Sequence, residues 1–586
     1  MNNGTPLLTS CKAIAGRRLE DLENLITVST LDAENAPHTV EALLLEDIDA
    51  LRSLSARFCR RLNRLRCPIL RLPPEIIRLI IDTVVDMVQS LSYYVSTQKL
   101  IMLGHVCHDF RANLLGMHAL WGRHAFAPDT LANHVFLERA QDAPIAIRLH
   151  TLSPAFLQDL AVQHLRRARD IDVSGKPLDM LVPGLQMQCF PLLDYLSLTT
   201  YATPALSLPQ TFSAPNLRRL TLKNVIPCFN EHRLTNLVTL TLHKETADIS
   251  SSLASTAQIV GILRSCAGLR ELDLRGFIPM LNELPEEEHP KAIYLPSLRM
   301  LSLSQDRITV LHFWKMLIIP PTTTIRIDFK DERPDSPSVP LAILVEDTNA
   351  FAAQVTAYND VMPPMSALRI HGVRSPEDQW WLSFGIFGGY CGVGTPHYLG
   401  LSPTEWTRIA GFYFTTDRWT EQELSAAIAR FVSIFKLSQI AYLSVDCLLG
   451  AGLLSTYETF PEVRRLHLDY CSETAAFLPL SVRSDIRTIP PTPRPSVPCP
   501  ALHTLYMSDN GASDDDEGFD FSFLRLALKG MLRSRSERGH PITVLGLEYD
   551  NVSDTDRQEL LNFVDEIRVY AQASHYAHRH IRDVFM

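Results

Sequence analysis

A short leucine string, L-x-x-L-x-L, recurs along most of this 586-residue chain and constrains its fold more than any other feature. Alternating apolar residues predict a short strand with one buried face. One such unit cannot bury its own apolar face, so neighbouring units must stack into a continuous array. The complete copies are Leu193-Leu196-Leu198, Leu217-Leu220-Leu222, Leu237-Leu240-Leu242, Leu269-Leu272-Leu274 and Leu298-Leu301-Leu303. The weaker copies are Ile147-Leu149, Ile171-Val173, Ile325-Ile327, Leu368-Ile370, Leu443-Val445, Val463-Leu466-Leu468, Leu502-Leu505-Met507 and Ile542-Leu545-Leu547.

The spacing of the complete copies, mostly 20 to 32 residues, resembles that of leucine-rich repeats. Two departures mark the array as irregular: nearly all copies lack the asparagine that regular repeats place after the strand, and the spacing loosens beyond residue 310. The resemblance implies an uneven α/β solenoid over residues 128–570. Helical or irregular stretches, such as 153–167 and 255–266, should lie between the strands. Insertions are expected near residues 305–365, 375–400 and 484–520.

Residues 72–88 predict a helix that is apolar on two sides. Leu72-Pro73-Pro74-Glu75 is typical of a helix start, because proline fits the first turn and Glu75 suits the positive end of the helix dipole. Helical residues four apart share a face. One stripe is Ile76, Ile80 and Val84; the other is Ile77, Ile81, Val85 and Val88. A unit of about 50 residues is too small to bury both stripes, so the second one needs a partner.

These residues and those that follow resemble the F-box family. The family's elements stand here as Leu72, Pro73, Glu75 and Ile76, then Leu103, Val106, Cys107 and Phe110, then Leu120-Trp121. The resemblance implies a three-helix F-box over residues 68–127 that docks on the small adaptor subunit of a cullin–RING ubiquitin ligase. It assigns adaptor binding to Leu72, Pro73, Pro74, Glu75, Ile76, Ile77, Ile80, Leu103, Val106, Cys107, Phe110 and Trp121. The stretch from Gln89 to Gln98 is longer than the family's usual turn between helices. The alternative is a plain three-helix bundle packed on its own C-terminal domain.

A second helix, over residues 39–67, is predicted just upstream. Leu44, Ile48, Leu51, Ser55, Phe58, Leu62 and Leu65 form a heptad seam with one polar break. Thr39 is the expected N-cap, acidic residues lead, basic residues trail, and Pro68 should end the helix. There are two interpretations: an intramolecular helix that leans on the F-box, or weak self-association through residues 44–65. Three heptads with a polar break are marginal for stable pairing, so the intramolecular helix is favoured. F-box proteins of mushroom-forming fungi often place such a helix before the box, and this chain resembles that group.

Composition narrows the class of protein further. Apolar content of 46% and charged content of 20% describe a folded chain, and the net charge of −10 argues against a nucleic-acid binder. We expect no membrane span and no signal peptide. The 11 cysteines show no C-x-x-C spacing and are expected to be reduced and mostly buried, in a cytoplasmic or nuclear protein. Residues 1–38 should be a flexible N-terminus and residues 571–586 a C-terminal tail.

Several histidine, cysteine and glycine clusters resemble metal or phosphate sites, but we do not expect them to bind metal or phosphate. His105, Cys107 and His108 could ligate a metal but are expected inside the second F-box helix, and His575, His578 and His580 should be solvated. The glycine-rich run 385–394 lacks the spacing of a phosphate-binding loop and is predicted to be a flexible loop beside Trp380-Trp381. Since no nucleophile–base motif occurs, we expect no catalysis, no metal and no cofactor. The proline-rich segment 489–500 and the acidic segment 508–520 are expected to be a surface linker and a solvated loop.

The combined patterns predict the substrate-recognition subunit of a ubiquitin ligase, with the adaptor and cullin as partners and the repeats holding a target protein. The target should bind the strand face, where residues between the core leucines point outward. These residues are Tyr195, Ser197, Arg219, Thr221, Thr239, Thr241, Glu271, Asp273, Met300 and Ser302. They are chemically mixed, so no substrate class follows. The alternative function is a repeat scaffold or protein-interaction module without a role in ubiquitin transfer.

Overall fold

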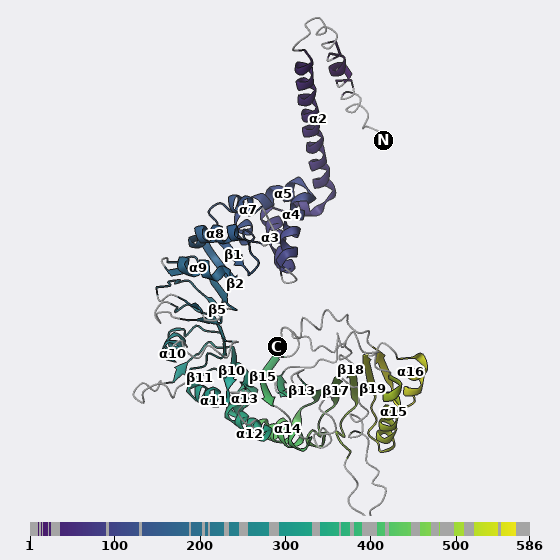
Figure 1. Ribbon diagram of the computed structural model, residues 1–586. Coiled ribbons are helices and arrows are strands. Elements are labelled where there is room, and N and C mark those ends of the chain that lie inside the picture. Colours follow the sequence, from purple (N-terminus) through teal and green to yellow (C-terminus); the bar gives the residue numbers. More distant parts are fainter. Residues whose placement is uncertain are drawn as a thin grey trace, which may run out of the picture. The chain divides into compact units, whose positions relative to one another are not determined.

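The computed structural model is a mixed α/β structure with one large, mostly parallel sheet (Figure 1). It describes residues 36–89, 93–127, 132–186, 189–201, 206–208, 211–227, 234–244, 256–279, 292–330, 340–361, 365–374, 380–388, 407–416, 421–446, 457–469, 480, 497–508, 521–548 and 552–569, with a few residues between 10 and 24. The chain divides into two units: unit 1 is Met1–Ala146 and unit 2 is Ile147–Met586.

Unit 1 is helical. Its elements are α2 (Ala36–Arg66), the 3-10 turn η1 (Pro68–Arg71), α3 (Pro74–Gln89), α4 (Tyr93–Val106), α5 (His108–Leu115), α6 (His118–Arg123) and α7 (Asn133–Ala140). The predicted helix start is confirmed, since the amides of Ile76 and Ile77 both donate to the Pro73 carbonyl. Trp121 joins α6 to α7: its indole N–H donates to the Leu114 carbonyl at 2.8 Å, and its ring meets Phe136 edge-on. The helical unit therefore continues past residue 127.

The second helix expected for the F-box is divided in two. Cys107 is extended (φ −162°, ψ 172°) between α4 and α5, so His105, Cys107 and His108 do not lie in one helix. In a continuous helix the Gly104 carbonyl would accept from the His108 amide. Instead the Arg111 guanidinium donates to Gly104 at 3.1 Å, which satisfies the carbonyl where the helix breaks. Residues 93–98, expected in a long connection, belong to α4.

Helix α2 differs from the prediction in two ways. It begins at Ala36 rather than after Thr39, because Pro37 fits its first turn. Its heptad seam is not packed on α3–α6: within the described residues, every seam position from Ile48 to Leu65 is exposed. The prediction that α2 packs its seam against the F-box helices is therefore wrong. Residues 16–21, expected to be flexible, are helical, and Arg18 Nε pairs with Asp47 at 2.9 Å.

Unit 2 is built on a 16-stranded sheet. In spatial order its strands are β1 (Ile145–Leu149), β2 (Ala168–Ser174), β3 (Tyr195–Thr199), β5 (Arg219–Lys223), β7 (Thr239–His243), β8 (Glu271–Arg275), β10 (Met300–Asp306), β12 (Thr324–Lys330), β15 (Thr407–Thr416), β14 (Trp380–Gly388), β13 (Met365–Arg374), β16 (Tyr442–Asp446), β17 (Arg465–Asp469), β18 (Thr504–Ser508), β19 (Val544–Glu548) and β20 (Glu566–Val569). All thirteen leucine strings lie in or lead into strands, as predicted. The two-stranded pairs are β4 (Leu206–Ser207) with β6 (Val225–Ile226) and β9 (Ile293–Tyr294) with β11 (Leu317–Ile318).

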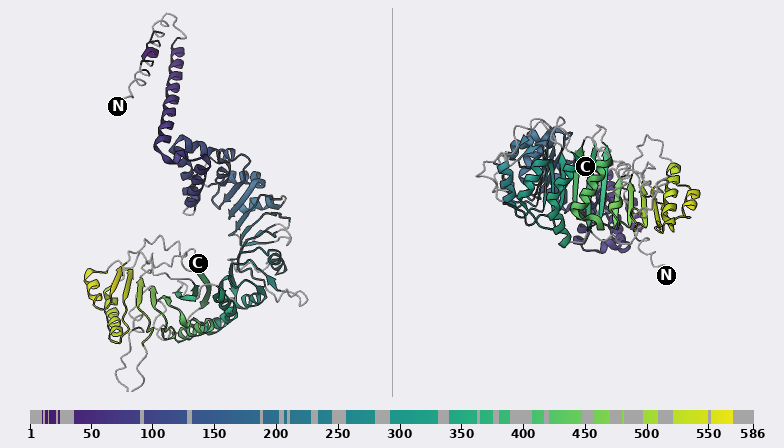
Figure 2. Two further views of the ribbon diagram at one scale, coloured as in Figure 1. Left: turned by 180° about the vertical axis from the view of Figure 1, so that it is seen from behind. Right: turned by 90° about the horizontal axis from the view of Figure 1, so that it is seen from below.

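Helices cover one face of this sheet, as the views in Figures 1 and 2 show for α11, α12 and α14. The helices of unit 2 are α8 (Ala155–His164), α9 (Pro177–Gln186), α10 (Thr256–Ser265), α11 (Arg307–Met316), α12 (Leu341–Asp347), α13 (Ala352–Val361), α14 (Glu421–Phe435), α15 (Phe521–Glu537) and α16 (Asp554–Leu560). Short 3-10 turns are η2 (Leu165–Arg167), η6 (Thr348–Phe351), η7 (Leu437–Gln439) and η9 (Tyr457–Thr459). The helical stretches predicted at 153–167 and 255–266 are confirmed by α8 and α10.

The parallel register places equivalent leucines side by side. Leu196 aligns with Leu220, Leu220 with Leu240, and Leu240 with Leu272, and all four are at most 1% exposed. Asn224 follows β5 with φ +55° and donates through Nδ2 to the Thr200 carbonyl at 3.0 Å. This is the asparagine that regular repeats place after the strand to bond the backbone of the turn, and most of the other copies lack it.

The region from 305 to 416 departs most from the expected insertions. Residues 307–330 form α11 and β12, which continue the parallel array. Strand β14 then runs antiparallel to both β13 and β15, so three strands occur where a regular repeat would add one. Residues 385–388, expected in a flexible loop, belong to β14 (Trp380–Gly388), and residues 389–394 of that predicted loop lie outside the described residues. The physical reason is that Leu382, Phe384 and Ile386 alternate inward and are buried.

The end of the proline-rich segment is not a surface linker. Cys499 is 1% exposed, and Arg535 from α15 donates to the carbonyls of Pro498 (2.7 Å) and Cys499 (2.9 Å). These bonds hold residues 498 and 499 against α15. Residues 489–496, 509–520, the histidines from 575 to 580 and the tail 571–586 lie outside the described residues.

Candidate interaction surfaces

Helix α3 separates its two apolar stripes. Ile77, Ile81 and Val85 are buried in unit 1, at 1 to 3% exposure. Ile76 and Val84, from the other stripe, are 41% and 37% exposed. The surplus apolar face predicted from the sequence is therefore present, and the structure identifies which stripe forms it.

The residues assigned to adaptor binding fall into two groups. Leu72, Pro73, Pro74, Glu75, Ile76 and Val106 are exposed, and Ile80, Leu103 and Cys107 are half-buried. Ile77, Phe110 and Trp121 are buried at 2 to 8% exposure. Their assignment as contact residues is wrong, because they form the core that α3, α5, α6 and α7 share. These three buried residues can support a docking surface only by holding the exposed residues in position.

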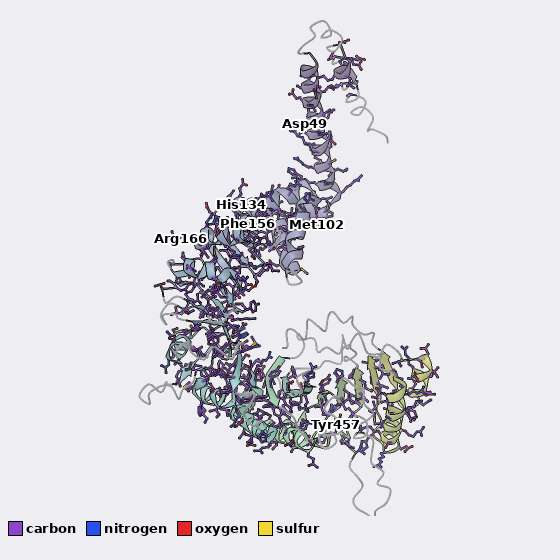
Figure 3. The ribbon with its side chains drawn as sticks, viewed as in Figure 1. Asp49, Met102, His134, Phe156, Arg166 and Tyr457 are labelled. Carbon is purple, nitrogen blue, oxygen red and sulfur yellow. The ribbon has the colours of Figure 1, made fainter. Side chains whose placement is uncertain are left out.

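The structure adds exposed apolar residues that the sequence reasoning missed. Leu79 and Met87 extend the exposed face of α3, and Met102, labelled in Figure 3, is exposed on α4. Leu79 lies one turn beyond Ile76, so the helical period could have identified it. Met102 could not be assigned from its own helix, because nearly every side of α4 carries apolar residues.

The second candidate surface is the open face of the sheet, opposite the helices. Strands β3, β5, β7, β8 and β10 present three aligned rows there. The predicted target residues form the first two rows: Tyr195, Arg219, Thr239, Glu271 and Met300, then Ser197, Thr221, Thr241, Asp273 and Ser302. Ser197 and Ser302 are buried at 6% and 8% exposure, which corrects their assignment as accessible residues. Their side chains are short and lie between larger ones, such as Asp273 and Arg326 beside Ser302.

A third aligned row was missed: Thr199, Lys223, His243, Arg275 and Ser304. Each follows the last leucine of its string, so strict alternation places it on the same face. Except for Ser304, these residues are half-exposed. The signal was available in the sequence, because the strands extend one residue beyond the leucine string.

Charged groups on this face pair across neighbouring strands. Arg219 Nη2 lies 3.4 Å from Asp194 and 4.0 Å from Asp170, and its guanidinium stacks 4.8 Å above the Tyr195 ring. Burial raises the pKa of Asp170, and the nearby arginine opposes that effect. The arginine therefore joins three successive strings.

Asp273 is the centre of a second charged group. It accepts from His243 Nε2 at 3.0 Å and from Arg275 Nε at 3.2 Å. Burial alone would raise the pKa of this carboxyl, but the bonds from His243 and Arg275 outweigh burial and lower it. Further along the face, Ser304 donates to Asp328 at 2.8 Å. The open face is thus polar and internally paired, with Met300 as an exposed apolar residue.

The groups with potential for chemistry do not assemble. His108 Nδ1 lies 3.3 Å from Asp109, while His105 Nδ1 faces Arg111. Among the residues that the structure describes, no three His, Cys, Asp or Glu side chains gather as metal ligands. The six described cysteines are free, but only Cys266 and Cys499 are buried, so the expectation of mostly buried cysteines fails for this set.

No protein-family model and no curated protein matches this chain. Within the described residues, no helix is long and apolar enough to cross a membrane.

Proposed function

We propose that this protein is the substrate-recognition subunit of a cullin–RING ubiquitin ligase. Helices α3–α6 would act as an F-box that binds the adaptor subunit. The strands of unit 2 would act as an irregular leucine-rich-repeat solenoid that binds a target protein. The proposal combines the motif residues from Leu72 to Trp121 with two surfaces of different chemistry, one apolar and one polar.

The observation that carries the proposal is the division of α3 into a buried stripe and an exposed one. Ile76 and Leu79 lie on the side of α3 opposite Ile77, Ile81 and Val85. Exposed apolar side chains on a short helical unit favour association, at about 25 cal/mol per Å² of apolar surface removed from water. An adaptor that covers this stripe would gain that free energy.

The polar face of unit 2 supports the second half of the proposal. Its three rows offer carboxylate, guanidinium, imidazole and hydroxyl groups over five adjacent strands. Such a mixture suits recognition of a folded protein surface by many weak polar contacts. The receptor itself would perform no chemistry; it would raise the local concentration of target lysines near the activated ubiquitin.

The test is recovery of adaptor and cullin peptides by mass spectrometry after purification of the tagged full chain from its native cells. Ile76→Asp, or Leu72→Ala with Pro73→Ala, should abolish that recovery, since a charge placed in an apolar interface is strongly unfavourable. Both changes lie at exposed side chains, so the chain should remain folded.

Leu152→Asp is the matched control, because Leu152 is an apolar residue that is 86% exposed outside α3–α6. It should leave adaptor recovery unchanged. If the folded wild-type chain brings down no adaptor, or if Ile76→Asp keeps it, the ligase proposal is wrong. A target recovered without adaptor would favour a repeat scaffold instead.

A further inference from the structure

Most of the heptad seam of α2 is an exposed apolar surface: every seam position from Ile48 to Leu65 is exposed, and Leu44 is half-buried. α2 has 31 residues, about 46 Å at 1.5 Å per residue. Leu51, Phe58 and Leu65 are 59%, 54% and 71% exposed. Leu45 and Leu54, which flank the seam, are also exposed. A helix with this seam favours a second helix of matching pattern.

Charge along α2 is divided between its halves. The N-terminal half carries Glu41, Glu46, Asp47 and Asp49, and the C-terminal half carries Arg57, Arg60, Arg61, Arg64 and Arg66. Two copies side by side in parallel would bring arginine against arginine. Two antiparallel copies would bring the acidic half of each against the basic half of the other. The division of charge between the two halves therefore favours the antiparallel orientation.

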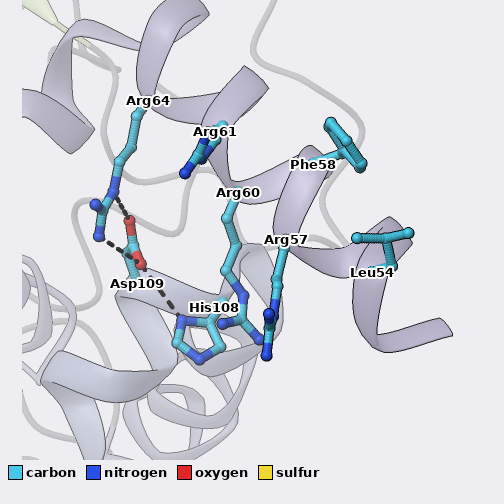
Figure 4. Close-up of a pocket in the computed structure, with 8 residues that line it drawn as sticks. All are labelled: Leu54, Arg57, Phe58, Arg60, Arg61, Arg64, His108 and Asp109. Carbon is cyan, nitrogen blue, oxygen red and sulfur yellow. Dashed lines mark hydrogen bonds and ion pairs between the residues drawn. The ribbon is translucent and has the colours of Figure 1, made fainter. Parts of the chain in front are cut away.

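The basic half of α2 borders an open hollow of about 470 Å³. Two apolar residues next to or on the seam, Leu54 and Phe58, line it together with arginines of α2 and with His108 and Asp109 of α5. Figure 4 shows Arg57 and Arg60 extending from α2 toward His108, with Arg64 paired to Asp109 at 2.9 Å. Apolar side chains beside unmatched positive charge fit an acidic amphipathic helix.

We propose that α2 forms an antiparallel coiled coil with α2 of a second copy of this chain. This inference goes beyond the proposed ligase function and does not depend on it. In the register that also pairs the acidic half with the basic half, Ile48 packs against the second copy's Phe58, with Leu44 against Leu62 and Leu51 against Ser55 on either side. All six resulting layers then contain at least one large apolar side chain.

The same register fixes the flanking pairs. The positions beside the seam place Asp47 of each copy against Arg61 of the other, and Leu54 of one copy against Leu54 of the other. Asp47 also pairs with Arg18 in its own chain, and a carboxylate has acceptor sites for both guanidinium groups. In a parallel dimer Asp47 would instead face Arg52, and Arg61 would face Arg66.

Sedimentation velocity on the full chain tests the dimer. The wild type should have twice the single-chain mass of 66.0 kDa. Leu51→Glu and Phe58→Glu should each return it to the single-chain mass, and both sites are exposed in one chain, so folding should persist. Ala56→Glu, an exposed position away from the seam, is the matched control and should remain dimeric.

A charge exchange tests the orientation. Asp47→Arg and Arg61→Asp should each raise the dimer Kd about tenfold, because each places like charges together. The double variant with both changes should recover the wild-type Kd. In a parallel dimer, Arg61→Asp would tighten association by facing Arg66. A wild-type chain with the single-chain mass, or a dimer that survives Phe58→Glu, overturns the proposal; tightening by Arg61→Asp overturns the antiparallel arrangement.

Discussion

Asn216 donates from Nδ2 to the backbone carbonyl of Pro191 at 2.7 Å, and Asn236 makes the same bond to Pro215 at the same distance. Each asparagine directly precedes the first leucine of its string, and each acceptor lies two residues before the first leucine of the preceding string. The entry turn of one strand is therefore tied by a side chain to the entry turn of the strand before it. These bonds supplement the main-chain ladder between parallel strands.

Replacing either asparagine should weaken this connection. We expect Asn216→Ala and Asn236→Ala each to lower the free energy of unfolding by about 1 kcal/mol, the usual net value of one hydrogen bond. Urea unfolding followed by circular dichroism measures the change. Arg218→Ala is the control, because its pair with Asp194 is exposed and spans 3.8 Å, and should change little. Equal midpoints for all three variants would contradict the assigned role.

A charge in the shared leucine core should affect the whole array. Leu220 is fully buried between Leu196 and Leu240, so Leu220→Asp should cost several kcal/mol and lower the melting temperature of unit 2. Thr221→Asp, at the next residue but on the open face, should leave melting nearly unchanged. Differential scanning calorimetry compares them. Similar losses for both variants would disprove the strand-facing assignment.

Cysteine reactivity should follow burial. Cys59 and Cys189 are exposed, whereas burial raises the pKa of the Cys499 thiol to about 12 and also raises the pKa of Cys266. The thiolate is the reactive form, so at pH 8.5 iodoacetamide should label Cys59 and Cys189 in the folded chain. Cys266 and Cys499 should react only after denaturation. Peptide mapping by mass spectrometry tests this order, and labelling of folded Cys499 at the rate of Cys59 would refute it.

Asp556 should stabilise α16 and its ion pair with α15 in a pH-dependent way. The Ser553 hydroxyl, which donates to it at 2.6 Å, and then Arg525 hold the pKa of this carboxyl below its usual 3.8. A depressed folded-state pKa contributes stability above the unfolded value, and that stability is lost as pH falls. Asp556→Asn should therefore be less stable than wild type at pH 7, with the difference shrinking below about pH 4. The fully exposed Asp554→Asn is the control and should show no such gap at either pH.

The strands were predictable because their pattern is local. Alternating leucines identify a strand and its buried face, and a repeated string sets the register between neighbours. Strands β14 and β15 were missed for the opposite reason. Their inward residues, such as Phe384 and Phe412, are aromatic and interleave with glycine, so no leucine string marks them. Their antiparallel order depends on contacts between segments far apart in sequence.

The α3 surface was predictable only in part. The sequence indicates two apolar stripes, but both are rich in β-branched residues, so composition cannot say which one is core. That choice depends on where α4 and α5 pack, and it removed Ile77, Phe110 and Trp121 from the contact surface. Similarly, the exposure of the α2 seam depends on which side of α2 faces α5, where Arg64 pairs with Asp109, and the heptad pattern does not specify that side.

The shared charges on the open face have an evolutionary consequence. Arg219 forms ion pairs with Asp170 and Asp194, and Asp273 accepts hydrogen bonds from His243 and Arg275. Each group therefore spans more than one leucine string. A substitution at one of these positions should change the stability effect of substitutions at the others, because the groups contact one another. Changes in the charge of this face should therefore arise through compensated pairs of mutations in adjacent strands. Duplication or loss of a single strand with its connection would separate such pairs, and lineages that keep the pairing should vary in side chains more readily than in the number of strands.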